Sequence, residues 1–239
     1  MIGIDNVRAV VTDIEGTTTS LAFVKEELFP YARRHLPQYV RDHAAEIADI
    51  EAQIRVLAGA GALDTAGVID TLLRWMDEDR KVTPLKQLQG LIWKSGYQSG
   101  QLLAHVYEDA VQALRQWHAA GIRLYVYSSG SVAAQRLLFS HTAHGDLTPL
   151  FSGYFDTTTG PKVDARSYRD IAAATGLPAH EIVFLSDHPG ETDAAAAAGM
   201  RSVLVARGQG SAGREPAAST FDDIVLKAAF RWSRSNAGT

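Results

Sequence analysis

The sequence predicts an α/β fold with a mostly parallel sheet and a helical domain inserted after the first strand. Two observations lead to this fold: short apolar segments alternate with helix-like stretches, and one long helical stretch interrupts the alternation. The composition is typical of a globular protein, because 46% of the 239 residues are hydrophobic and 21% are charged. A chain of this length can bury a core without disulfides, and it contains no cysteine.

Four segments are predicted to be buried strands, because apolar, β-branched and aromatic residues run almost continuously through each of them. They are residues 7–14, 122–129, 181–187 and 202–206, and a weaker fifth candidate covers residues 154–156. Helices are expected between these strands, over residues 132–140, 165–175 and 192–198. Strands that alternate with helices in this way favour parallel pairing.

A long insertion separates the first two predicted strands, which lie more than 100 residues apart. Within it, apolar residues recur at helical spacing in the segments HAAEIADIEAQIRVLAG and AGVIDTLLRWMDEDRK. A crossover between neighbouring parallel strands needs far fewer residues. We therefore predict a core domain of residues 1–19 and 111–239 and an inserted helical domain of residues 20–110.

Charge and hydropathy argue against two classes of partner. Lys and Arg number 23 against 27 Asp and Glu, and the resulting net charge of −4 gives no electrostatic reason to expect nucleic acid. No apolar run approaches the roughly 18 residues of a membrane span. The first residues also lack the order of a signal peptide. We expect a cytoplasmic protein that binds neither nucleic acid nor membrane.

Polar residues gather where three of the predicted strands end. The first strand runs into DIEGTTT at residues 13–19, the second ends in SSG at 128–130, and a later one ends in SD at 186–187. In an open, Rossmann-like sheet, ligands bind outside the carboxyl ends of the strands. The three clusters should therefore converge on one crevice.

The carboxylates of this crevice predict a site for a hard divalent cation. Asp13 and Glu15 lie two residues apart on an extended chain, so both side chains can point the same way, and Asp187 would supply a third carboxylate. Such a set suits Mg²⁺, which would also remove the repulsion between the carboxylates. Gly16 and the threonines after it offer N–H and hydroxyl donors for phosphate. An isolated Asp13 would be read as a turn or cap residue, and this context favours the metal.

The serines that end the second strand allow three interpretations: a nucleophile pair, a helix N-cap or phosphate ligands. No histidine partner or Gly-x-Ser-x-Gly elbow supports a nucleophile, and Ser131 fits the cap better, so phosphate binding is favoured for Ser128 and Ser129. A lone loop lysine is usually solvated, but beside a phosphate crevice Lys162 would neutralise phosphoryl and carboxylate charge. Glu191 would either support the metal or stabilise the start of its helix.

In order and spacing, these motifs together resemble the four motifs of the haloacid dehalogenase-like phosphatase superfamily. They are Asp13-x-Glu15-Gly16-Thr17, Ser128-Ser129-Gly130, Lys162 and Ser186-Asp187-x₃-Glu191. The superfamily usually has Asp at the position of Glu15, and this departure points to one branch. The strings VVTDIEGTTTSLAFVKEELFPYARRHL, KQLQGLIWKSGY and YVYSSGSVAAQRLLF resemble the enolase-phosphatases nearly end to end.

The resemblance implies an activity and a substrate. The enzyme would enolise a small phosphorylated diketone of methionine salvage, 5-methylthio-2,3-dioxopentyl phosphate, and then release inorganic phosphate. Asp13 would be the nucleophile and form an aspartyl-phosphate, and Lys162 would orient it. Ser128 and Ser129 would bind the phosphate.

The resemblance also implies a cofactor and a role for the insertion. Mg²⁺ would be held by Asp13, Asp187 and Glu15, the last of these commonly through its backbone carbonyl. The inserted domain would close over the substrate as a cap and exclude water from the enol intermediate. A monomer is expected. We also expect Glu15 to be the general acid/base for the leaving oxygen, and either Glu15 or a water bound to Mg²⁺ to move the carbon-1 proton during enolisation.

Three alternatives stay open. Another phosphomonoesterase of the superfamily, acting on sugar or glycolate phosphates, would use the same residues. A metal-free dehalogenase would use Asp13 as a nucleophile on carbon and would not need Glu15 or Asp187. A non-catalytic module would keep only the fold, but every expected catalytic position is occupied here.

Overall fold

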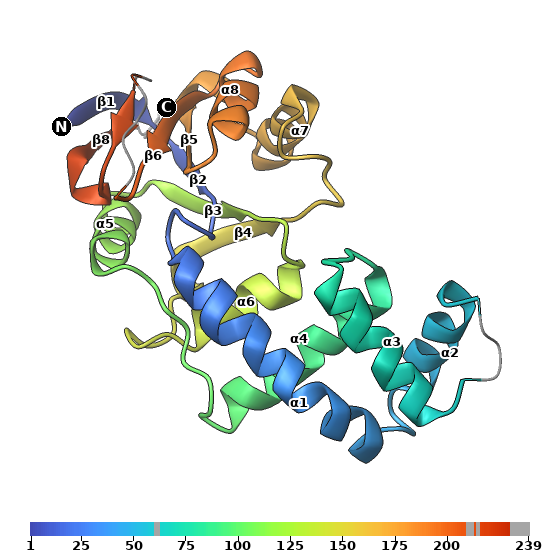
Figure 1. Ribbon diagram of the computed structural model, residues 1–239. Helices are drawn as coiled ribbons and strands as arrows, with labels where there is room; N and C mark the ends of the chain where they lie inside the picture. Colours follow the sequence, from blue (N-terminus) through green and yellow to red (C-terminus); the bar gives the residue numbers. More distant parts are fainter. Residues whose placement is uncertain (60–62, 209–212, 214–215, 230–239) are drawn as a thin grey trace, which may run out of the picture. The chain divides into compact units, whose positions relative to one another are not determined.

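The computed structural model describes residues 1–59, 63–208, 213 and 216–229. The chain forms two compact units, shown in Figure 1: the first unit comprises Met1–Leu21 and Ala104–Thr239, and the second unit comprises Ala22–Leu103. The predicted boundary at residue 110 differs from this division. Residues 104–110 belong to the first unit because the amide of Ala104 donates to the carbonyl of His141 (2.8 Å) and that of Tyr107 to the carbonyl of Thr18 (3.0 Å).

The first unit contains a six-stranded sheet in the order β4-β3-β2-β5-β6-β7, with every neighbouring pair parallel (Figure 1). The predicted parallel α/β fold is confirmed. The strands are β2 (Ala9–Thr12), β3 (Arg123–Tyr127), β4 (Phe151–Phe155), β5 (Ile182–Ser186), β6 (Arg201–Val205) and β7 (Ala217–Ala218).

The register of the central strands aligns their carboxyl ends. Thr12 at the end of β2 pairs with Val126 of β3 on one side and with Leu185 of β5 on the other. All residues of β2 and β5 are buried, as their continuous apolar runs predict. The residues that follow these three strands therefore emerge along the same edge of the sheet.

The predicted strand over residues 7–14 corresponds to β2, and its first residue, Val7, ends a separate strand that the sequence did not predict. β1 (Ile2–Val7) pairs in parallel with β8 (Ile224–Ala228) in a separate two-stranded sheet, and β2 follows after one residue. The pairing of β1 with β8 shifts in register between Ile4 and Val7, where Asn6 has a left-handed φ of 56°. Residues of β1 are alternately half-buried and exposed over its first positions, so no continuous apolar run marks it in the sequence.

Helices of the first unit pack against the sheet. They are α5 (Glu108–Ala119), α6 (Val132–Ser140), α7 (Ala165–Thr175) and α8 (Pro189–Ala197), with 3₁₀ turns at Thr148–Leu150, Ala179–Glu181 and Phe221–Asp223. Helices α6 and α7 have the predicted bounds. The Ser131 side chain caps α6 by accepting from the amide of Ala134, and Gly176 ends α7 with a φ of 66°. Pro189 opens α8, where its missing N–H costs nothing.

The second unit is helical, as the apolar spacing predicts. It contains a π-helix at Phe23–Leu28 and the helices α1 (Phe29–Asp42), α2 (Ala48–Leu57), α3 (Thr65–Asp77) and α4 (Thr83–Gln98). Buried side chains from these four α-helices, such as Leu36, Ile54, Leu72 and Leu88, form its own apolar core. No helix among the described residues is long and apolar enough to cross a membrane.

Candidate active site

Asp13 directly follows β2, and its surroundings come from strands and loops far away in the sequence. Its amide donates to the carbonyl of Leu185 (2.9 Å), which fixes the end of β2 against β5. Its side chain is buried, and the carboxylate oxygen Oδ1 accepts a hydrogen bond from Nζ of Lys162 at 2.6 Å. An aspartate at this depth is therefore paired with a cation supplied by a loop 149 residues further along the chain.

Lys162 joins two carboxylates. Its Nζ also lies 2.7 Å from Oε2 of Glu191, which in turn accepts from the hydroxyl of Ser186 (2.8 Å). The side chains of Lys162 and Glu191 are only 10% and 12% exposed, so these contacts are shielded from water. To the two roles predicted for Glu191 the structure adds a third: it anchors the lysine that contacts Asp13.

Two buried tyrosines hold the loop that carries Lys162. The hydroxyl of Tyr168 donates to the Lys162 carbonyl (2.6 Å), and that of Tyr127 donates to the Gly160 carbonyl (2.9 Å). The Nζ atom of Lys162 also lies 5.7 Å from the centre of the Tyr127 ring, within cation–π range. Sequence reasoning missed both tyrosines, because they read simply as core residues of a strand and a helix.

The charges around Asp13 do not balance. Burial raises the pKa of the Asp13 carboxyl to about 7 despite the opposing charge of Lys162, and the negative charge of Glu191 adds to the rise. Burial alone would lower the pKa of Lys162, but the neighbouring Asp13 and Glu191 carboxylates more than offset this, so its pKa is raised. The single ammonium group of Lys162 is thus paired with two carboxylates, those of Asp13 and Glu191, and the remaining negative charge favours binding of a further cation.

Asp187 follows β5 and lies against the loop that leaves Asp13. A Cβ atom placed on Gly16 would fall 2.0 Å from Oδ2 of Asp187, so only glycine leaves room for this carboxylate. Gly16 also has a φ of +76°, which favours glycine. The amide of Asp187 donates to the hydroxyl oxygen of Thr17 (2.9 Å). Burial, followed by the charge of Glu191, raises the pKa of Asp187.

The loop after Asp13 is a closed turn, and this overturns one prediction. The amides of Thr17, Thr18 and Thr19 all donate to the carbonyl of Ile14 (3.2, 3.0 and 2.9 Å), and that of Gly16 donates to the carbonyl of Thr19 (2.8 Å). The sequence predicts that these amides donate to a phosphate, and this prediction is wrong because they already donate to backbone carbonyls. They stabilise the turn instead.

Glu15 belongs to the same turn and is half-buried. Its backbone forms an isolated bridge with Thr19. Among the described residues, no group of three or more His, Cys, Asp or Glu side chains is arranged to hold a metal ion. The structure therefore does not gather the carboxylates of Asp13, Glu15 and Asp187 into one three-carboxylate cluster.

Ser128 and Ser129 follow β3, the neighbour of β2. Ser128 is buried, and its hydroxyl oxygen accepts from the amide of Gly130 (3.2 Å), so its own O–H is left to donate. Ser129 is exposed on the same turn. The side-chain amide of Gln135 donates to the carbonyls of Gly130 and Phe155 (both 2.8 Å) and ties the turn to β4.

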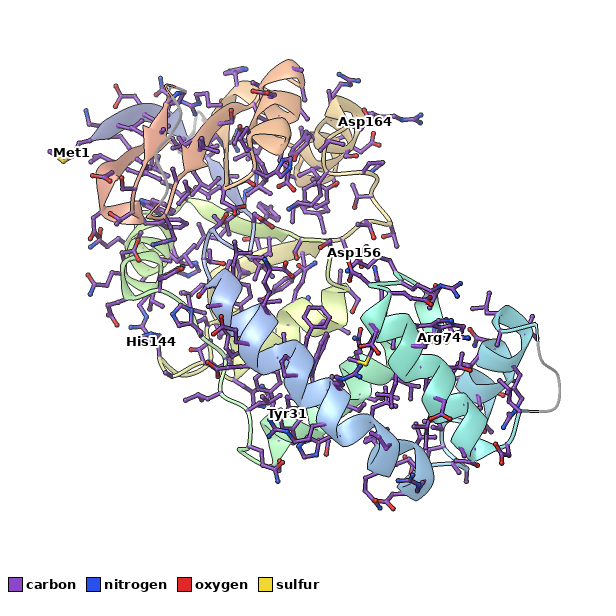
Figure 2. The ribbon with its side chains drawn as sticks, viewed as in Figure 1. Met1, Tyr31, Arg74, His144, Asp156 and Asp164 are labelled. Carbon is purple, nitrogen blue, oxygen red and sulfur yellow. The ribbon has the colours of Figure 1, made fainter. Side chains whose placement is uncertain are left out.

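Asp156 fixes the start of α6 beside this turn. Figure 2 labels it on the loop after β4, and its Oδ2 accepts from the amide of Val132 at 3.1 Å. The roles of Gln135 and Asp156 were not predicted from the sequence. The position of Gln135, five residues after Gly130, could have indicated that its side-chain amide holds the turn. The turn at Ser128–Gly130 lies at the edge of the sheet where Asp13 emerges, next to a helix start that favours anions.

Comparison with known proteins gives a consistent assignment. Residues 7–199 match the haloacid dehalogenase-like hydrolase family. "Enolase-phosphatase E1" of Pseudomonas aeruginosa strain UCBPP-PA14 is 55% identical over 92% of this chain and 99% of its own length. The protein of the same name from Methylococcus capsulatus strain Bath is 54% identical over 91% of this chain and 97% of its own.

Solved structures agree on the fold. The crystal structure of the UTR4 protein of Saccharomyces cerevisiae has a TM-score of 0.79 and 35% identity, covering 91% of this chain and all of that one. CbbY of Rhodobacter sphaeroides, in complex with phosphate, has a TM-score of 0.56 over 90% of this chain and 95% of that one. At 16% identity, it supports the fold alone.

Proposed function

The chain belongs to the haloacid dehalogenase-like hydrolase family, and from this premise we propose that it is an enolase-phosphatase of methionine salvage. It converts 5-methylthio-2,3-dioxopentyl phosphate to the acireductone and inorganic phosphate. The observation that carries the proposal is the buried Asp13 carboxylate, paired with Lys162 at the edge of the sheet where the Ser128 turn and Asp187 also emerge. Relatives of matching length with this activity in their name give it the substrate class.

In the proposed dephosphorylation, the Asp13 carboxylate attacks phosphorus and the bond from phosphorus to the substrate oxygen breaks. Lys162 holds the attacking carboxylate through Oδ1 and so orients the other oxygen of Asp13. The Ser128 hydroxyl and the exposed Ser129 bind the transferred phosphoryl group. Water then hydrolyses the aspartyl-phosphate and regenerates Asp13.

Glu15 is our candidate for proton transfer. It would take a proton from carbon 1 of the diketone during enolisation and give one to the leaving oxygen. A side chain two residues beyond the nucleophile, half-buried in a closed turn, can face the same ligand as Asp13. The superfamily usually has aspartate at this position, so the longer side chain is suited to the additional step.

The donor set fits a magnesium ion. Mg²⁺ in proteins is commonly bound by one or two carboxylates together with waters and substrate phosphate, so it needs no three-carboxylate cluster. Asp13 and Asp187 would be those carboxylates, with the Glu15 backbone carbonyl as a further ligand, and the excess of negative charge at Asp13 supports the fit. When bound, the ion neutralises charge that develops on the phosphoryl oxygens.

The remaining parts of the proposal come from the family resemblance. The second unit would serve as a cap, and the enzyme would act as a monomer in the cytoplasm on a small phosphorylated substrate. The role of the second unit as a cap stays a prediction.

The test is an assay of the purified enzyme on the diketone phosphate and on a panel of sugar phosphates, with and without Mg²⁺. In the presence of Mg²⁺, we expect the diketone phosphate to yield inorganic phosphate and a conjugated enol. The enol is detected by its ultraviolet absorbance. Glu15→Gln should slow the enol-forming reaction while the protein still binds Mg²⁺. Faster turnover of a sugar phosphate would contradict the proposal and favour the other phosphomonoesterases. Release of halide from a 2-haloacid in the presence of EDTA would favour a dehalogenase.

A further inference from the structure

A largely shielded ion pair between Arg207 and Asp109 contacts the turn that follows Asp13 and takes no part in the proposed chemistry. Arg207 lies just beyond β6 and Asp109 in the first turn of α5. The two guanidinium nitrogens Nη1 and Nη2 contact the two carboxylate oxygens at 3.1 and 2.9 Å. The side chains are only 11% and 14% exposed. Such a pair gains little stability, because both charges lose their water.

The guanidinium of Arg207 is held on every side. It lies over the ring of Tyr107, 3.8 Å from its centre, and 5.3 Å from the centre of the Phe221 ring. The Asp109 carboxylate that binds it also accepts from the amide of Phe221 at 2.7 Å. Its position is therefore fixed by two aromatic rings and a bidentate carboxylate.

The remaining donor of this rigid group reaches the turn after Asp13. The Nε atom of Arg207 donates to the carbonyl of Thr17 at 2.6 Å. Thr17 is fully buried, and its hydroxyl oxygen accepts from the amide of Asp187 at 2.9 Å. The turn itself is closed by the bond from the Thr17 amide to the carbonyl of Ile14. A shift of Arg207 would therefore move Thr17 and, with it, Asp187 relative to Asp13.

Arginine is the residue that these contacts require. Its planar guanidinium presents Nε–H and the two terminal groups in a fixed fork, so one side chain can bind a carboxylate bidentately and a carbonyl at the same time. Lysine keeps the positive charge but has one nitrogen and no fixed plane. It can pair with Asp109 or reach Thr17, but it cannot fix both in the same geometry.

We propose that Arg207, fixed by Asp109, is a positioning residue for the phosphatase reaction. It holds Thr17 in place, and the Thr17 hydroxyl in turn fixes the position of the Asp187 amide relative to Asp13. The inference rests on the proposed function for its effect on turnover. Its structural part, the link from Arg207 through Thr17 to the Asp187 amide, stands on contacts in the first unit alone.

The test compares Arg207→Lys with Arg201→Lys. Arg201 is a matched control because it lies in β6, six positions earlier in the same segment, and also donates to backbone carbonyls, those of Asp5 and Asn6. In the protein without metal, we expect hydrogen exchange at the Asp187 amide, measured by NMR, to be up to about tenfold faster in Arg207→Lys. In the same variant, kcat for phosphate release should fall about 10- to 100-fold. Arg201→Lys should change neither quantity.

A double-mutant cycle separates positioning from a general loss of stability. Thr17→Val removes the hydroxyl that accepts from the Asp187 amide and keeps the branched shape of the side chain. If Arg207 acts through Thr17, Arg207→Lys combined with Thr17→Val should lose little more kcat than Thr17→Val alone.

Two results would overturn the inference. One is an Asp187 amide that exchanges at the wild-type rate in Arg207→Lys. The other is full additivity of the two substitutions in kcat, which would show that Arg207 acts by another route. Failure of the proposed function looks different: the wild-type protein itself would release no phosphate from the diketone phosphate, while the exchange measurement would still report the link to Asp187.

Discussion

The two units bury different kinds of side chain. Among the described residues, the buried polar and charged side chains of the second unit, apart from tyrosine and tryptophan, are Glu51, Thr71 and Gln89, and most of its core is apolar. The first unit buries many more, and several of them lie at or shortly after the ends of its strands: Asp13, the three threonines of the next turn, Ser128, Ser186 and Glu191.

This contrast separates a region built for packing from one built for chemistry. A buried polar group costs free energy unless it is hydrogen-bonded, and a buried charge costs more unless it is paired. In the first unit these groups bond to one another, as in the connected contacts of Asp13, Lys162, Glu191 and Ser186. Even so, the pKa of Asp13 is raised, so part of the cost is not offset. The second unit buries fewer polar and charged side chains.

The largest expected effect is on chemistry in the first unit. Asp13→Asn removes the attacking carboxylate but keeps the size of the side chain, so phosphate release should fall at least about 10⁴-fold. A steady-state assay of phosphate release on the diketone phosphate measures this loss.

Asp164→Asn is the matched control for Asp13→Asn. Figure 2 labels Asp164 at the start of α7, where its side chain accepts from the amide of Arg166, and asparagine caps a helix about as well. Activity should stay near the wild-type level. If the Asp13→Asn enzyme turned over as fast as the Asp164→Asn enzyme, Asp13 would not be the nucleophile.

An intermediate effect, on stability alone, is expected in the second unit. Leu72 is fully buried in the apolar core of the second unit, so Leu72→Ala should lower the free energy of unfolding by about 2–5 kcal/mol through lost contacts and a cavity. Denaturant unfolding measures the loss. Hydrogen exchange should accelerate in residues 22–103 and stay unchanged in β2 and β5.

Leu103→Ala is the control for Leu72→Ala, because this leucine is 59% exposed in the same unit. It should change the free energy of unfolding by less than about 0.5 kcal/mol. If both substitutions cost the same, or if β2 and β5 lose protection along with the second unit, then the two units do not have separate cores.

The smallest effect is a dependence of stability on pH. Folding raises the pKa of Asp13 from 3.8 to about 7, so the folded protein without metal binds an extra proton between these values and becomes less stable as pH rises through them. The Asp13→Asn variant has no carboxyl group at this position and therefore does not take up this proton. Its melting temperature relative to the wild type should therefore increase from pH 5 to pH 7.5, as measured by scanning calorimetry. A difference that stays flat or decreases would show that Asp13 ionises freely in the fold.

The sequence predicted the parts of the site that depend on local chain geometry. Continuous apolar runs predicted β3, β5 and β6 to within one or two residues, and helical spacing together with capping residues predicted α6 and α7. Polar residues at strand ends predicted that Asp13, Ser128 and Asp187 would emerge at one edge of the sheet. In parallel strands this follows from the order of residues along each strand.

Other features came only from the structure. Strand β1 depends on its pairing with β8, whose residues lie at the other end of the chain. The turn after Asp13 directs its amides inward to the carbonyl of Ile14, where the sequence predicts phosphate donors. Neither is visible in spacing, because each depends on where a hydrogen-bond partner lies after the chain has folded.

The amino-acid sequence by itself determined the α/β class, the helical insertion and the residue types of the site, since these follow from periodicity and from the motifs at strand ends. Tertiary structure decided the pairing of Lys162 with both Asp13 and Glu191, and the link from Arg207 through Thr17 to Asp187. These contacts join segments that are distant along the chain. Their distances and burial arise only when the strands and helices pack, and burial is what makes their charges matter.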